Sequence, residues 1–199
     1  MELTRIQHVI SELAKEDHSD ADCLLVTVLT HGLNSHILQA YDKLYEVEEL
    51  WLPFTADKCL SLAGKPKIFI IQACRGDKFN PGVTLKQEEA MPMQTDTIHE
   101  TYRIPACADF LIAFSSVEDY KSWRIPKEGT WFIQSFCEEL QKHASTKDLL
   151  KIFTQTAHRV AVDYESSHPL CPDKHKKKQV PCTYTMLIRD LHLHPKIKN

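Results

Sequence analysis

The chain has 199 residues, 43% of them hydrophobic and 26% charged, and a formal net charge of −3. These values are ordinary for one globular domain with a sizeable core. The slightly acidic balance gives no reason to expect nucleic acid or an anionic membrane as a partner. The longest apolar run, residues 23–29, is far shorter than the ~20 residues that a membrane-spanning helix needs.

The cysteines give a prediction about the cellular compartment. They form an odd set without closely paired spacings: Cys23, Cys59, Cys74, Cys107, Cys137, Cys171 and Cys182. Such a set argues against a disulfide framework and for reduced thiols. The first residues also lack the apolar core of a signal peptide. We therefore expect a cytoplasmic protein.

Apolar periodicity and turn residues predict the elements along the chain. In order, these are a helix at 3–15, a strand at 23–30, helical or turn-like segments at 47–53 and 56–63, a strand at 67–72, an exposed polar linker at 77–105, a strand at 110–115, helices at 130–142 and 147–164, a loop at 166–179 and a strand at 182–191. Continuous apolar strands separated by helices predict a largely parallel sheet that is covered on both faces.

Two of these strands end on residues that can carry chemistry. Strand 67–72 leads into Gln-Ala-Cys-Arg-Gly at 72–76, and strand 23–30 is followed by His31 and Gly32. A cysteine beside a strand is most often an inert core residue, and a lone histidine is usually a hydrogen-bonded group. A cysteine and a histidine at two strand ends, however, supply the nucleophile and the acid/base partner of covalent catalysis. With the pentapeptide intact, we predict a catalytic pair.

The pentapeptide is a known caspase signature, and the chain closely resembles an effector caspase catalytic domain from about residue 4 to 193. Further ordered blocks carry the resemblance, namely Ser-Leu-Ala-Gly-Lys-Pro-Lys-Ile-Phe-Ile-Ile (61–71), Ala-Asp-Phe-Leu (108–111), Tyr-Lys-Ser-Trp-Arg (120–124), Gly-Thr-Trp-Phe-Ile-Gln-Ser-Phe-Cys (129–137) and Lys-Lys-Gln-Val-Pro-Cys (177–182). The resemblance implies an α/β three-layer sandwich, with a mostly parallel sheet of six strands in the complete fold, flanked by helices. It also implies a cysteine endopeptidase that cuts after aspartate, an executioner of apoptosis without metal or cofactor.

The resemblance assigns the catalytic roles. Cys74 would attack the peptide carbonyl, and His31 would carry the proton chemistry. The backbone N–H groups of Gly32 and Cys74 would form the oxyanion hole. A glycine at this position fits that role, because a bare backbone can approach the reacting carbonyl closely.

The resemblance also assigns the substrate-binding residues. Arg124 and Gln72 would hold the substrate aspartate, since a guanidinium meets a carboxylate with two hydrogen bonds. Standing alone, Arg124 would more often be a solvated loop charge, and Trp131 a core residue. Ser122, Trp123 and Trp131 match residues of the neighbouring pockets. Two other positions differ from the family, because Lys121 replaces an aromatic wall and Ile125 replaces a polar residue. At Ile125 we expect no second acidic preference.

The resemblance gives the domain organisation. Residues 1–199 would form one catalytic domain, N-terminally truncated because the family has two strands and a helix before the helix at 3–15. Cleavage after Asp96 would divide a large part, 1–96, from a small part, 97–199. Asp77 is a weaker candidate for this cut. Two processed units would pair through the last strand into a homodimer. Inhibitor-of-apoptosis proteins and upstream caspases would be partners.

Two alternatives stay open at this stage. His168, Cys171, His175 and Cys182 could be read as zinc ligands, although the family has a variable loop here. The second alternative is a non-catalytic homologue or fragment that binds partners or substrates without turnover. The intact pair of Cys74 and His31 argues against it, and the missing N-terminal pocket argues for it.

Overall fold

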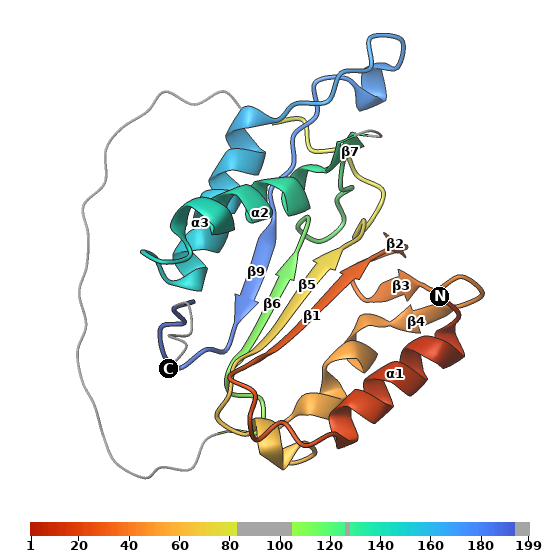
Figure 1. Cartoon of the computed structure of the whole chain (residues 1–199). Coiled ribbons are helices and arrows are strands. Elements are labelled where there is room, and N and C mark those ends of the chain that lie inside the picture. The colour runs from red at the N-terminus through yellow and green to blue at the C-terminus, as the bar shows by residue number, and fades with distance from the viewer. Residues whose placement is uncertain (83–104, 126–127, 194–199) are drawn as a thin grey trace.

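The computed structural model describes residues 1–82, 105–125 and 128–193. Its central sheet has the strand order β1-β5-β6-β9 (Figure 1). The bounds are β1 Leu24–Leu29, β5 Lys67–Gln72, β6 Phe110–Phe114 and β9 Cys182–Thr185. The first three strands run parallel, and β9 runs antiparallel to β6. The predicted α/β fold with a mostly parallel sheet is confirmed.

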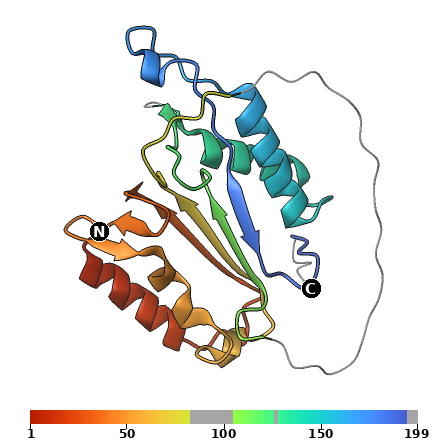
Figure 2. The ribbon, with the colours of Figure 1, turned by 180° about the vertical axis from the view of Figure 1, so that it is seen from behind.

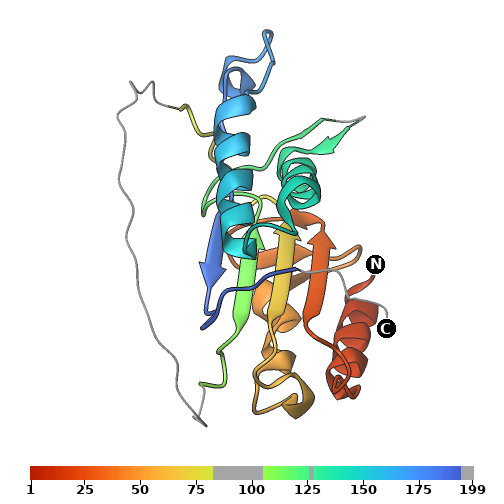
Figure 3. The ribbon, with the colours of Figure 1, turned by 60° about the vertical axis from the view of Figure 1, so that its left-hand side comes forward.

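Strand β5 is buried on both faces because its side chains alternate. Phe69 and Ile71 join the core that also contains residues of helix α1 (Leu3–Lys15). Ile68 and Ile70 join a second core with α2 (Trp131–His143) and α3 (Leu149–Asp163). Figure 1 and Figure 3 show α1 and the α2–α3 pair on opposite sides of the sheet. Two helical layers therefore hold the central strands rigidly.

The two C-terminal helices begin where the sequence supplies capping residues. The Thr130 side chain accepts from the backbone N–H of Ile133 at 3.4 Å, and the Asp148 carboxylate accepts from Lys151 N–H at 3.1 Å. Such caps satisfy donors that the first helical turn leaves free. The predicted helices at 130–142 and 147–164 are therefore confirmed to within two residues at either end. No helix in the described segments is long and apolar enough to cross a membrane.

A small antiparallel sheet that the periodicity did not predict follows β1 directly. It consists of β2 (His31–Gly32), β3 (Ile37–Gln39) and β4 (Leu44–Glu46). The segments predicted as helical or turn-like form short 3₁₀ helices at Val47–Leu50, Leu52–Phe54 and Leu60–Leu62. A further 3₁₀ helix spans Pro172–Lys174. Because β2 continues from β1, this small sheet lies beside the carboxyl end of the main sheet.

The prediction of a strand over residues 182–191 is wrong in its extent, because β9 ends at Thr185. Leu187 and Leu191 leave the sheet and pack against the core beneath α2 and α3. The Leu191 carbonyl also accepts from Leu149 N–H at 2.8 Å. The chain therefore leaves the sheet after Thr185 and buries these leucines against the helices instead of extending β9. Figure 2 shows β9 at the opposite end of the sheet from β1.

Candidate active site

The register of the central sheet brings the two predicted catalytic residues to one place. Leu29 of β1 pairs with Gln72 of β5, and Thr30 N–H donates to the Gln72 carbonyl at 3.0 Å. His31 and Cys74 each lie two residues beyond this pair. The pairing of β1 with β5 ends at Leu29 and Gln72, so the segments that carry His31 and Cys74 leave the main sheet at the same edge.

Gly32 packs directly on the backbone of Cys74. A Cβ built on Gly32 would overlap the Cys74 carbonyl oxygen, and it would lie 3.2 Å from the Cys74 carbonyl carbon and 3.3 Å from the Ala73 Cβ. Real side chains do not tolerate such an approach, so the site requires glycine here for steric reasons. This contact joins the start of β2 to the residue that follows β5.

A second segment, residues 115–122, encloses the cysteine from the other side. The Cys74 Sγ lies 3.5 Å from the backbone N of Ser122 and 3.8 Å from its carbonyl oxygen. The Ser115 hydroxyl donates to the Ala73 carbonyl at 2.9 Å. Arg75 N–H donates to the Tyr120 carbonyl at 3.1 Å. The loop that carries the thiol is therefore fixed by bonds to a segment more than 40 positions away in the sequence.

Arg75, next to the cysteine, is a positioned residue that the sequence analysis did not identify. Its side chain is buried, and it forms an ion pair with Glu118 at 3.1 Å. The guanidinium carbon lies 4.1 Å from the ring centroid of Phe114 and 5.7 Å from that of Tyr184. The Tyr184 hydroxyl donates to the same Glu118 carboxylate at 3.2 Å. Arg75 thereby links the cysteine loop to β6 and β9. Its only signal in the sequence is its place beside the cysteine.

Gln72 and Ser122 meet beside the thiol. The Gln72 amide nitrogen donates to the Ser122 hydroxyl at 2.7 Å, and the buried Gln72 Oε1 has no hydrogen-bond partner among the described residues. Arg124 lies two residues after Ser122, in strand β7 (Arg124–Ile125), which pairs with β8 (Gly129–Thr130). Arg124 is exposed, and its guanidinium makes no hydrogen bond or ion pair with a described side chain. Ser122 and Arg124 thus form the polar face of residues 121–124, and Gln72 lies against it.

The aromatic residues form the other face. The Trp123 ring lies 5.8 Å from Trp131, 5.6 Å from Phe79 and 6.1 Å from His168, centroid to centroid. Trp131 is only 4% exposed, and it also stacks on Tyr164 at 5.2 Å. Trp131 therefore supports Trp123 from behind, while the half-buried Trp123 is available at the surface.

The predicted processing residue, Asp96, lies outside the described residues. The proposed zinc residues do not gather, since the described chain holds no group of three His, Cys, Asp or Glu side chains suited to a metal ion. His175 Nδ1 instead accepts from the backbone N–H of His168 at 3.2 Å. Residues 78–82, predicted as part of a linker, pair with neighbouring segments through bridges from Lys78 and Asn80.

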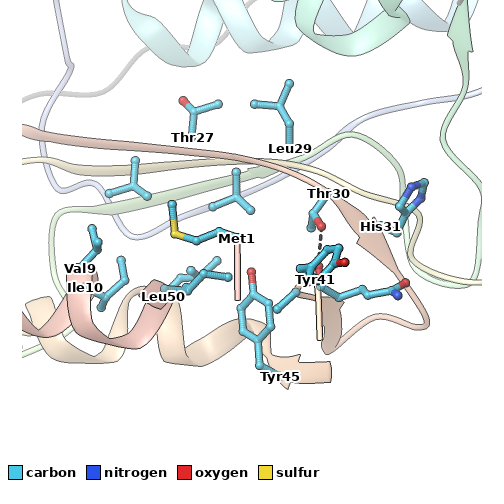
Figure 4. Close-up of a pocket in the computed structure, with 15 residues that line it drawn as sticks. Met1, Val9, Ile10, Thr27, Leu29, Thr30, His31, Tyr41, Tyr45 and Leu50 are labelled. Atoms are coloured by element: carbon cyan, nitrogen blue, oxygen red, sulfur yellow. Dashed lines mark hydrogen bonds between the residues drawn. The ribbon is translucent and has the colours of Figure 1, made fainter. Parts of the chain in front are cut away.

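A hollow of about 540 Å³ lies along β1 and extends to His31. Figure 4 shows Met1, Tyr45 and Leu50 along it, with His31 at one end beyond Thr30. Neither Cys74 nor Arg124 lines it. The hollow therefore follows the edge of β1, where Leu29 is exposed, and its lining does not include the residues around the thiol.

Comparisons with known proteins agree with this geometry. The family profile described as "Caspase domain" matches residues 1–192. Caspase-1 of Spodoptera frugiperda is 50% identical over 185 residues, which are 92% of this chain and 60% of that protein. Caspase drICE of Drosophila melanogaster is 45% identical over 194 residues, 96% of this chain and 56% of that protein.

Similarity extends to a solved structure. The crystal structure of Caspase-1 from Spodoptera frugiperda matches with a TM-score of 0.90 and 46% identity, covering 100% of this chain and 73% of that one. Caspase-3 of Bos taurus is 39% identical over 188 residues, covering 92% of this chain and 64% of that protein. The chain thus spans between about half and two thirds of the length of these curated relatives.

Proposed function

The chain belongs to the caspase family, and from the geometry of its site we propose that it is a cysteine endopeptidase that cleaves peptide bonds after aspartate. The observation that carries this proposal is that β1 and β5 end in register, at Leu29 and Gln72, and that Gly32 packs on the backbone of Cys74. The names of its relatives, all caspases, support the same activity.

In the proposed reaction, the Cys74 thiol gives its proton to His31, and the resulting thiolate sulfur forms a bond to the carbonyl carbon of the substrate aspartate. The carbon–nitrogen bond breaks, and His31 gives a proton to the departing amine. Water then attacks the acyl-enzyme, His31 takes its proton, and the thiol is released with a new carboxyl terminus. General acid/base catalysis of this kind contributes roughly 10²–10⁴ in rate.

Charge that develops on the carbonyl oxygen would be stabilised by the backbone N–H groups of Gly32 and Cys74. The close packing of these two backbones supports this assignment. Donors that are already held in place cost no reorganisation during the reaction.

Gln72 and Arg124 would receive the substrate aspartate, and Ser122 would hold the Gln72 amide through their hydrogen bond. The Arg124 guanidinium has no carboxylate partner among the described residues and is thus available to a substrate carboxylate. Its fork of N–H donors matches both carboxylate oxygens. Trp123, supported by Trp131, would contact the side chains further along the substrate.

Maturation and assembly complete the proposal. Cleavage after Asp96 would separate residues 1–96 from 97–199, and two processed units would pair through β9, the strand at the end of the sheet order. We further propose an executioner role in apoptosis within the cytoplasm. Upstream caspases would activate the enzyme, and inhibitor-of-apoptosis proteins would restrain it.

A pair of fluorogenic tetrapeptides tests the proposed function. One ends in aspartate before the reporter, and the other ends in asparagine, which has the same size without the charge. We expect release from the aspartate peptide and roughly 30-fold to several thousand-fold slower release from the asparagine peptide, because a charged contact is worth about 2–5 kcal/mol. A folded chain that binds the aspartate peptide without releasing the reporter would instead be the non-catalytic homologue.

Gly32→Ala tests the close packing at the oxyanion hole. The added methyl group overlaps the Cys74 carbonyl, so either β2 or the cysteine loop must shift. Misplacement by about 1 Å can cost roughly 10²-fold in rate, and we expect a loss of this size in kcat for the aspartate peptide. Leu33→Ala, at the exposed next residue, is the matched control. Unchanged kcat in Gly32→Ala would contradict the assigned geometry.

A further inference from the structure

The segment 121–124 presents different chemistry on its two faces. Ser122 contacts Gln72 and the Cys74 sulfur. The residues on either side of Ser122, Lys121 and Trp123, both contact the ring of Phe79 instead. Side chains of an extended segment alternate in this way, which places Arg124 on the same face as Ser122.

Lys121 is the cation of the aromatic face. Its ammonium nitrogen lies 5.3 Å from the Phe79 ring centroid and 2.8 Å from the Asp77 carboxylate. Its backbone N–H donates to the Lys78 carbonyl at 2.9 Å, which fixes the start of the side chain. The Lys121 side chain is 32% exposed, so the ammonium sits at the rim of the aromatic face and stays within reach of a bound peptide.

The ion pair with Asp77 does not prevent the Lys121 ammonium from binding a substrate carboxylate. The Asp77 side chain is 91% exposed and is therefore well solvated. Ion pairs between exposed side chains contribute a median of about 0–1 kcal/mol. A carboxylate delivered by a bound substrate can replace Asp77 at little cost, since the substrate is already held by its other contacts.

An extended substrate alternates its side chains as well. When its aspartate meets Arg124 on the polar face, the preceding side chain points to the face of Phe79, Trp123 and Lys121. A glutamate there would lay its two methylenes on the rings and reach Lys121 with its carboxylate. A neutral side chain could use only the rings.

On the basis of the proposed function, we propose that Lys121 is a specificity-determining residue that favours glutamate immediately before the cleaved aspartate. The absence of an acidic preference expected at Ile125 concerns a different position, because Ile125 lies beyond Arg124 in β7. The site would thus select two consecutive acidic side chains through two separate cations.

Three reporter peptides that differ only in the residue before aspartate test this inference, with glutamate, glutamine or valine at that position. For the unaltered chain we expect kcat/KM about two- to fivefold higher for glutamate than for glutamine, the range that a solvated ion pair supports. Lys121→Gln should bring this ratio to about one, and Lys121→Arg should retain it. Asp77→Asn should raise it, because the competing carboxylate is gone.

Lys142→Gln, which removes an exposed charge in the last turn of α2, is the matched control and should leave the ratio unchanged. A glutamate-to-glutamine ratio that is the same in the unaltered chain and in Lys121→Gln would overturn the inference while the aspartate peptides are still cleaved. Failure to cleave any of the three would instead overturn the proposed function, and the inference with it.

Discussion

Cys74→Ala is expected to lower kcat/KM for the aspartate peptide by at least about 10⁴-fold, because in the proposed reaction the Cys74 sulfur forms the acyl-enzyme. Binding of the peptide should persist, since Arg124, Gln72 and Trp123 are unchanged. The measurement is reporter release, together with the Kd of an uncleaved aspartate peptide. His31→Ala should cost about 10²–10⁴-fold.

The double variant of Cys74 and His31 tests whether the two side chains act together. Because thiol and imidazole act as a unit, adding His31→Ala to Cys74→Ala should cause no further loss. Cys137→Ala, at an exposed cysteine on α2, is the matched control and should retain full activity. Losses that multiply in the double variant would contradict the pairing of the ends of β1 and β5.

Arg124→Gln is expected to lower kcat/KM for the aspartate peptide roughly 30-fold to several thousand-fold. This range corresponds to about 2–5 kcal/mol for removing one partner of a charge pair, which becomes buried when the bound substrate covers the exposed Arg124. The effect should be selective, because cleavage of the slower asparagine peptide does not use the charge. The measurement is therefore the ratio of kcat/KM for the two peptides in each variant.

Two further variants separate a lost contact from a lost fold. Arg124→Lys keeps the charge without the two-pronged fork and should restore only part of the activity. Arg5→Gln makes the same chemical change on the exposed side of α1 and should change nothing. An aspartate-to-asparagine ratio that survives Arg124→Gln would show that another group selects the aspartate.

Local sequence patterns predicted the parts of the fold that local interactions determine. Residues 67–72 and 110–114 form continuous apolar strands because both faces are buried, and burial of both faces is visible in composition. Cys74 follows one of these strands and His31 follows β1, and both were predicted at one edge of the sheet because parallel strands end at the same edge. The helix starts expected from apolar spacing lie within two residues of those that the structure caps with Thr130 and Asp148.

The features that escaped prediction depend on contacts between distant residues. The three-stranded sheet of β2, β3 and β4 consists of strands two or three residues long, too short for a periodic signal. The enclosure of Cys74 by Ser122, and the ion pair of Arg75 with Glu118, join segments 43 to 48 positions apart. The early end of β9 follows from packing of Leu187 and Leu191 against helices. None of these contacts leaves a local pattern.

Covalent labelling tests the central claim most directly. An acetyl-tetrapeptide chloromethyl ketone ending in aspartate should alkylate one of the seven cysteines, and peptide mapping by mass spectrometry should place the adduct on Cys74. Labelling should be lost in Arg124→Gln and slowed in His31→Ala. An adduct on a different cysteine, or no adduct on a folded chain, would contradict the account.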